Sequence, residues 1–165
     1  PVKRLWLARA LDDPTPVHAA IPAGVRGLIE RADLICYPMG SFYTSLVANL
    51  LPSGLGRAVA ANPCPKVFVP GAGHDPEALG LDVAGQAEVL VRYLRAEAPD
   101  EIRARDVLDL VLINGDTDIY PCGVDRSRLS GLGVLPRACR LAASGRAGVL
   151  SASLLAPVLL SLARG

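Results

Sequence analysis

Short apolar runs rich in β-branched residues recur along this chain, and the stretches between them have the length and pattern of helices. The clearest runs are Asp33–Tyr37 (D-L-I-C-Y), Lys66–Val69 (K-V-F-V) and Leu108–Ile113 (L-D-L-V-L-I). Runs of this kind are typical of parallel strands that are buried on both faces. Alternation of strand and helix favours right-handed crossovers between such strands. The sequence therefore predicts an α/β fold with a Rossmann-like open, mainly parallel sheet and helices on both faces.

The remaining segments complete this prediction. We expect further strands at Lys3–Ala8 and Val134–Cys139. Apolar spacing predicts helices at Ala23–Arg31, Ser41–Leu51, Leu55–Ala61, Val83–Ala96 and Ile102–Val107, followed by a Leu-rich helix within Ala147–Ala163. The last stretch contains Pro157 and falls short of the ~20 apolar residues that a membrane span needs. A helix packed on the core is therefore favoured over a membrane segment.

Composition excludes several classes of protein. The 17 basic and 16 acidic side chains are interspersed and aromatic residues make up 4%, so neither a basic stripe nor a set of stacking residues indicates a nucleic-acid partner. The four cysteines lie far apart without a C-x-x-C pair, which argues against a zinc site. Free thiols suit a reducing compartment, so we expect a cytoplasmic protein.

Three polar or glycine-rich loops follow the three clearest strands. They read P-M-G-S-F-Y-T-S after Tyr37, P-G-A-G-H-D-P-E after Val69, and N-G-D-T-D after Ile113. In open parallel sheets, ligands bind in the crevice at the carboxyl ends of the strands. Since all three loops are expected along that edge, the sequence predicts a ligand site there.

The first loop is a candidate seat for a phosphate. Gly40 allows a close approach of the backbone, and Ser41 is placed to cap the following helix by accepting from the amide of residue 43 or 44. The remaining amides would then face the crevice as an anion site, with the hydroxyls of Thr44 and Ser45 as added donors. The alternative is an ordinary capping serine followed by two helix hydroxyls. The stretch is not a Walker A loop.

The second loop carries titratable side chains. Gly71 and Gly73 leave the backbone free to approach a ligand, and His74 beside Asp75 is a candidate general base. Glu77 adds a further carboxylate. The alternatives are a solvated histidine and an aspartate that starts a turn before proline.

The third loop contains two aspartates at a strand end. Asp116 and Asp118 offer oxygen ligands that suit Mg²⁺ held partly by substrate phosphates. Asn114 is a candidate hydrogen-bonding partner for a ligand. An Asn-Gly turn with solvated aspartates explains the same residues, and the sequence leaves both interpretations open.

A longer pattern surrounds the first loop. The run A-D-L-I-C-Y-P-M-G-S-F-Y-T-S-L-V-A-N-L-L at 32–51, followed by P-K-V-F-V at 65–69, resembles the 2-phospho-L-lactate transferase (CofD-like) family. That family includes the gluconeogenesis factors that bind sugar nucleotides. The resemblance extends loosely from Val2 to the closing Leu-rich helix, and it implies a single CofD-like α/β domain over residues 1–165.

The resemblance also implies roles for particular residues. It places Gly40, Ser41, Thr44 and Ser45 at a nucleotide or phosphate pocket. In the second loop, Gly71 stands near a position where family members commonly have Asn, while residues 77 and 80 match a later G-E-T-like turn. The second loop therefore looks closer to a divergent branch than to the transferase itself. The first strand and glycine-rich turn of the family have no counterpart here, so we expect either the C-terminal portion of a longer protein or a truncated relative.

The resemblance implies two functions. The first is transfer of a phospholactyl or phosphoenolpyruvyl group from a guanylated donor to the hydroxyl of a deazaflavin (FO), with Mg²⁺ as cofactor. The second is a non-catalytic regulator that binds a nucleotide sugar. Both imply a nucleotide-diphosphate-linked small molecule as partner, without nucleic acid or membrane. Association into a homo-oligomer is left open.

Overall fold

The computed structural model describes residues 2–142 and 149–164, and its centre is a four-stranded parallel sheet. The strands are β1 (Ile35–Tyr37), β2 (Lys66–Phe68), β3 (Leu110–Asn114) and β4 (Leu135–Cys139), and their spatial order follows the chain. Each neighbouring pair is parallel, with β1 on β2, β2 on β3 and β3 on β4. This confirms the predicted open parallel sheet and the strand predicted at Val134–Cys139.

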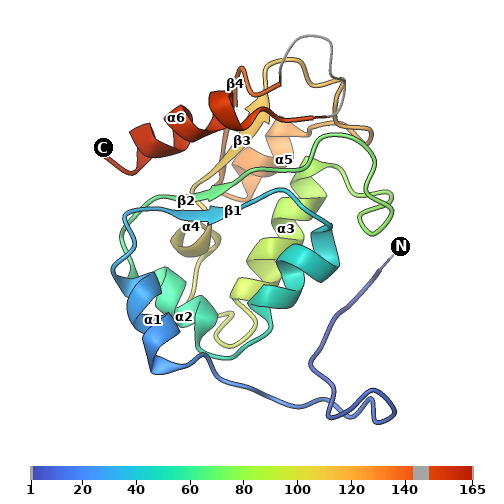
Figure 1. The fold of residues 1–165 in the computed structure, drawn as a ribbon, viewed down its shortest axis with the longest axis vertical. Coiled ribbons are helices and arrows are strands. Elements are labelled where there is room, and N and C mark those ends of the chain that lie inside the picture. Colours follow the sequence, from blue (N-terminus) through green and yellow to red (C-terminus); the bar gives the residue numbers. More distant parts are fainter. Residues whose placement is uncertain (1, 143–148, 165) are drawn as a thin grey trace.

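Helices cover both faces of the sheet unequally (Figure 1). The face that carries most of the core packs against α1 (Ala23–Glu30), α2 (Leu55–Ala61), α3 (Val83–Leu94), α4 (Ala104–Val107) and α5 (Arg126–Gly131). The other face packs against α6 (Ala152–Leu162). The first residues of the stretch predicted to form this last helix lie outside the described residues.

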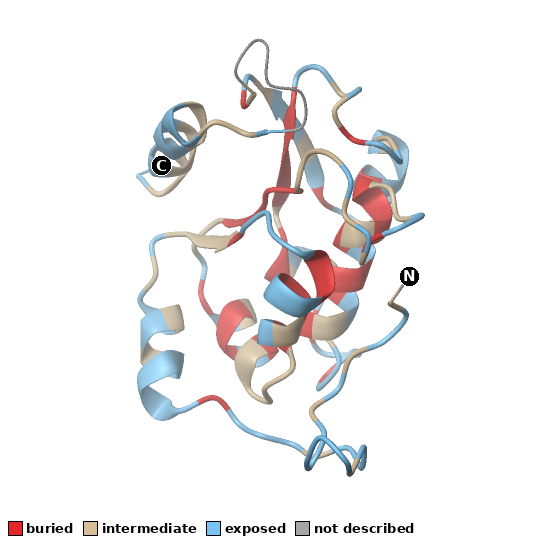
Figure 2. Ribbon diagram, turned by 45° about the vertical axis from the view of Figure 1, so that its right-hand side comes forward, coloured by how far each residue is buried: buried red, intermediate tan, exposed pale blue. Residues whose placement is uncertain are grey.

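Alternation along the strands produces these two apolar layers. Phe68 and Val111 belong to the larger cluster with α3, while Val67 and Leu112 belong to the smaller cluster under α6. Successive side chains of a strand point to opposite faces, so a continuous apolar run supplies both layers. Figure 2 shows buried residues in β2, β3, α2 and α3, and none in α6.

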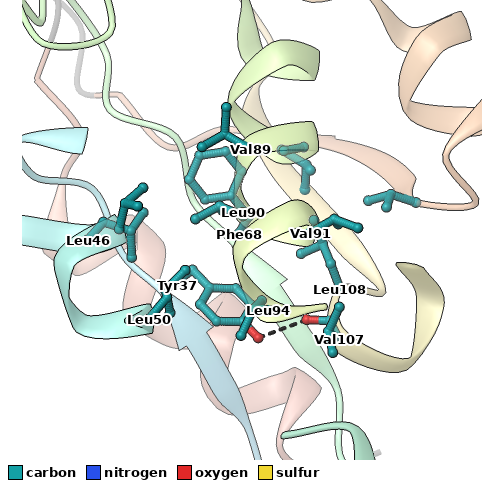
Figure 3. Packing of buried hydrophobic residues seen from close by; sticks show 14 of the residues in the cluster. Tyr37, Leu46, Leu50, Phe68, Val89, Leu90, Val91, Leu94, Val107 and Leu108 are labelled. Carbon is teal, nitrogen blue, oxygen red and sulfur yellow. Dashed lines mark hydrogen bonds between the residues drawn. The ribbon is translucent and has the colours of Figure 1, made fainter. Parts of the chain in front are cut away.

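A close-up of the larger layer shows how β1, β2 and α3 pack together (Figure 3). The Tyr37 hydroxyl is buried and donates a 2.8 Å hydrogen bond to the Val107 carbonyl. Burial raises the pKa of this phenol well above its ordinary value. Nearby, Gly56 of α2 lies so close to α3 that a Cβ added there would stand 1.8 Å from the Leu94 carbonyl oxygen. The helix layer therefore leaves no room for a side chain at that position.

Three sequence predictions need correction. Lys3–Ala8 is not a strand: the segment is extended, and its one β contact is an isolated bridge from Ala8 to Pro16. The segment instead lies against α3, where the Leu5 amide donates to the Tyr93 hydroxyl. Ser41–Leu51 is not an α-helix but a π-helix at Phe42–Leu46 followed by a 3₁₀-helix at Val47–Leu50. Helix α5 was not predicted.

One further observation concerns membranes. Across residues 2–142 and 149–164, every helix is too short or too polar to pass through a bilayer.

Candidate functional site

A pocket of about 410 Å³ lies at the carboxyl ends of the strands. Its walls come from the loop after β1, the loop after β2 and the segment after β3, together with the first turn of α3. The lining includes Gly40 and Ser41 from the first loop and Gly71, Gly73, His74 and Asp75 from the second. The Gly73 amide also donates to the Ile119 carbonyl at 2.8 Å, which ties the second loop to the third. The first two predicted loops therefore meet at one edge and line the pocket, whereas the third loop contributes its continuation at residues 120–123 and none of residues 114–118.

The backbone amides that open the π-helix are engaged by carboxylates of the second loop. The Phe42 amide donates to Asp75 Oδ2 at 2.7 Å, and the amides of Tyr43 and Thr44 donate to Glu77 Oε2 at 2.8 and 2.9 Å. The Thr44 hydroxyl donates to the other oxygen of Glu77 at 2.7 Å. We call this set of contacts the carboxylate clamp.

The carboxylate clamp corrects the predicted cap. No side-chain hydrogen bond from Ser41 caps the helix. A carboxylate is a stronger acceptor than a hydroxyl, and it also neutralises the positive end of the helical turn. The hydrogen bonds from Thr44 lower the pKa of Glu77 below its ordinary value, so the Glu77 carboxylate is charged at neutral pH. The prediction that these amides face the crevice as free donors is therefore wrong for this conformation.

His74 and Asp75 lie side by side on the pocket lining but do not form a hydrogen-bonded pair. His74 is exposed. Both oxygens of Asp75 accept from backbone amides, one from Phe42 and one from Glu77 at 2.9 Å. The aspartate thus holds the second loop against the first, and the histidine is oriented by no carboxylate among the described residues.

The third loop is organised around Asn114, which is buried. Its side-chain oxygen accepts from the amides of Leu141 and Ala142 at 2.9 and 3.0 Å, and its side-chain nitrogen donates to the Asp116 carbonyl at 2.9 Å. This geometry matches the turn interpretation, because all the polar atoms of the side chain are used within the chain. Asp116 accepts from the Asp118 amide at 3.0 Å.

The described residues do not fit a magnesium site built by the protein alone. Asp116 and Asp118 are exposed on the turn and do not line the pocket. Within residues 2–142 and 149–164, no three His, Cys, Asp or Glu side chains are grouped so that they could hold a metal ion.

The pocket also has an interior that sequence reasoning missed. Its deeper wall includes the buried side chains of Phe42, Phe68 and Tyr120, together with the half-buried Gln86 of α3. Burial raises the pKa of the Tyr120 phenol, which therefore stays protonated at neutral pH. The aromatic residues look like ordinary core positions in the sequence. The only available signal was a glutamine in the first turn of an otherwise apolar helix face.

Of the other predicted site residues, three lie outside the pocket lining: Thr44, Ser45 and Glu77. Thr44 and Glu77 are bonded to each other, and the Ser45 amide donates to the Ser41 carbonyl at 2.9 Å. The structure thus brings Gly40, Ser41, Gly71 and Gly73 together around the pocket. The hydroxyls of Thr44 and Ser45 do not line it.

Comparison with known proteins identifies relatives of this fold and sequence. The family model described as 2-phospho-L-lactate transferase CofD matches residues 2–132. Two curated relatives are each named "Putative gluconeogenesis factor". The one from Nostoc sp. is 31% identical over an alignment of 127 residues, and the match covers 69% of this chain and 26% of that protein. The one from Thermotoga maritima is 33% identical over 87 residues, which are 52% of this chain and 24% of that protein.

Solved structures share the architecture. Two crystal structures of a Bacillus halodurans protein, one described as a member of the upf0052 family, superpose with TM-scores of 0.70 and 0.68 at 23% and 21% identity. The matches cover 88% and 92% of this chain but 49% and 48% of those chains. The chain thus spans about half the length of these solved relatives and about a quarter of the curated ones.

Proposed function

The chain belongs to the family described as 2-phospho-L-lactate transferase CofD, and we propose that its pocket binds a nucleotide-diphosphate-linked small molecule. The family match carries this proposal, because residues 2–132 contain all three loops that follow β1, β2 and β3 around the pocket. The position of the pocket supports it, since open parallel sheets bind nucleotides at the carboxyl ends of their strands.

Within the predicted set, we assign ligand contact to the residues that line the pocket. Gly40, Gly71 and Gly73 line the pocket, and because they have no side chain a ligand can approach the backbone closely there. The hydroxyl of Ser41 is exposed and makes no cap bond, so it is available as a donor to a phosphate oxygen. Thr44 acts through the carboxylate clamp, where it holds Glu77.

For the whole protein, the proposed chemistry is transfer of a phospholactyl or phosphoenolpyruvyl group from a guanylated donor to the hydroxyl of FO. The FO oxygen would form a new bond to the phosphorus of the transferred group, the diphosphate bond of the donor would break, and guanosine monophosphate would leave. His74 is exposed on the pocket lining and is the proposed acceptor of the proton that this hydroxyl loses. Asp75 would position the loop that carries it. Mg²⁺ would neutralise the donor phosphates and would depend on them for its ligands.

A second candidate function is a non-catalytic regulator that binds a nucleotide sugar. Two observations favour it. Both curated relatives are named "Putative gluconeogenesis factor". Asp75 accepts hydrogen bonds from two backbone amides and not from His74. A histidine without a carboxylate partner is a weaker general base.

Calorimetric titration of the 165-residue chain with GDP and UDP, with and without Mg²⁺, tests the proposed binding. We expect saturable binding of at least one nucleotide, weakened in Ser41→Ala and unchanged in Ser130→Ala, an exposed serine of α5. If neither GDP nor UDP binds, the proposal is refuted.

The two functions are separated by incubating the protein with a guanylated donor, FO and Mg²⁺ and measuring product by mass spectrometry. Product formation that is lost in His74→Ala supports the transferase. Nucleotide binding without product supports the regulator.

A further inference from the structure

The pocket changes in character from its mouth to its interior. Gly40, Ser41 and His74 are exposed, whereas Phe68 is 1% exposed and Tyr120 is 4% exposed. The interior walls are completed by other buried or half-buried apolar side chains: Leu46, Ala78, Leu81 and Val83. A group that enters fully therefore leaves water and meets mainly apolar and aromatic surface.

The charges around the pocket oppose an anion in that interior. Among the described residues of the lining there is no Lys or Arg, and Asp75 contributes a carboxylate. The three amides that open the π-helix already donate to Asp75 and Glu77. A phosphate in the interior would be buried without a counter-charge and would face a like charge. The exposed mouth keeps a phosphate in contact with water.

Gln86 supplies polar groups to the interior. It lies in the first turn of α3 and is half-buried on the pocket lining. Within the described residues, no hydrogen bond engages its side-chain amide. A primary amide offers both a donor and an acceptor, so it can pair with a ring edge that carries an N–H beside a carbonyl. The Tyr120 hydroxyl accepts from the Asn114 amide at 2.9 Å and retains its own proton to donate.

From these observations, and resting on the proposed function, we propose that the interior of the pocket holds the uncharged heterocyclic base of the nucleotide. Gln86 determines specificity by hydrogen bonding to the edge of the base. The phosphates stay at the mouth beside Ser41 and His74. The volume of about 410 Å³ is within the usual range of small-molecule pockets.

The test uses competition in calorimetry, with whichever of GDP and UDP binds the 165-residue chain. The competitors are the matching nucleoside and inorganic diphosphate at equal concentrations. We expect the nucleoside to displace the nucleotide and diphosphate to fail. In Gln86→Leu, which keeps a similar volume, the affinity for nucleoside and nucleotide should fall by about tenfold, as expected from a lost hydrogen bond. Glu88→Gln, an exposed position of the same helix that does not line the pocket, is the matched control and should bind normally.

The outcomes distinguish the inference about the base from the proposed nucleotide binding on which it rests. Displacement by diphosphate but not by nucleoside would overturn the inference and leave the proposed function standing. So would unchanged affinity in Gln86→Leu, once circular dichroism has shown that the variant is folded. Failure of both nucleotides to bind the wild-type chain would refute the proposed function and, with it, the inference.

Discussion

Replacing Asn114 with alanine should destabilise the protein without weakening nucleotide binding. The side chain is buried and makes three hydrogen bonds, to the amides of Leu141 and Ala142 and to the carbonyl of Asp116. Each hydrogen bond contributes about 0.5–1.5 kcal/mol. In the variant the amides of Leu141 and Ala142 lose their acceptor and the Asp116 carbonyl loses its donor. We therefore expect a loss of about 2–4 kcal/mol in the free energy of unfolding.

The assay is urea denaturation followed by circular dichroism, compared at equal m-values, together with thermal unfolding. For a domain of this size, a loss of about 3 kcal/mol lowers Tm by about 6–12 °C. Asn49→Ala is the matched control, because the Asn49 side chain is exposed and makes one hydrogen bond, to the Ser45 carbonyl. Its loss should stay below about 1 kcal/mol.

Two results would refute the reasoning. If Asn114→Ala costs no more than Asn49→Ala, the hydrogen bonds of Asn114 do not hold the third loop in solution. If Asn114→Ala has the same free energy of unfolding as wild type but binds nucleotide at least tenfold more weakly, the residue is a ligand contact and its role in the turn is secondary.

Three further predictions concern stability. Gly56→Ala should cost about 1–3 kcal/mol or more, because the new Cβ would stand 1.8 Å from the Leu94 carbonyl oxygen and the two helices must separate; urea denaturation measures it. Tyr37→Phe should cost about 1–2 kcal/mol in the same assay, since the buried Val107 carbonyl loses its donor. Glu77 has a lowered pKa in the folded state, so its stabilisation is complete above the unfolded pKa of about 4.3 and disappears as pH falls through the folded value. The stability difference between wild type and Glu77→Gln should therefore shrink as the pH is lowered below about 4, and a series of denaturation curves against pH would show it.

The controls for these predictions come from the same chain. Gly24→Ala places a Cβ where, apart from the adjoining residues and the backbone of its own helix, no atom lies within 4 Å, so it should be neutral or slightly stabilising in helix α1. Equal losses at Gly24 and Gly56 would contradict the close contact between α2 and α3. A difference between wild type and Glu77→Gln that stays constant down to pH 2 would contradict the charged clamp.

The sheet could be predicted because strands buried on both faces leave an unmistakable pattern. Residues 34–37 and 67–69 are apolar at successive positions, as a strand that is covered on both faces requires. The strand predicted at Lys3–Ala8 from the same kind of pattern was wrong. The segment is extended and partly apolar, but it lies on a helix, and a strand needs a neighbouring strand that composition cannot reveal.

The candidate site could be located but not described in detail. Its position followed from the topology, since loops after neighbouring parallel strands meet at one edge. The carboxylate clamp could not be foreseen, because Glu77 and the amides of Tyr43 and Thr44 lie far apart in sequence. Local reasoning therefore assigned the cap to the nearby Ser41, whereas a charged acceptor from another loop holds the amides.

The parallel register of the sheet has a consequence for how the pocket forms. Ile35 pairs with Lys66, and Val67 pairs with Leu110, so each pairing closes a long loop of chain before it yields any stabilising contact. Proteins rich in such distant contacts fold slowly. The walls of the pocket come from segments that follow three different strands and from α3, so none of these segments can serve as a binding surface by itself. During refolding, any ligand of the pocket should bind only after the slowest strand pairing is complete. The rate at which refolding protein binds the ligand would therefore report the rate of that pairing.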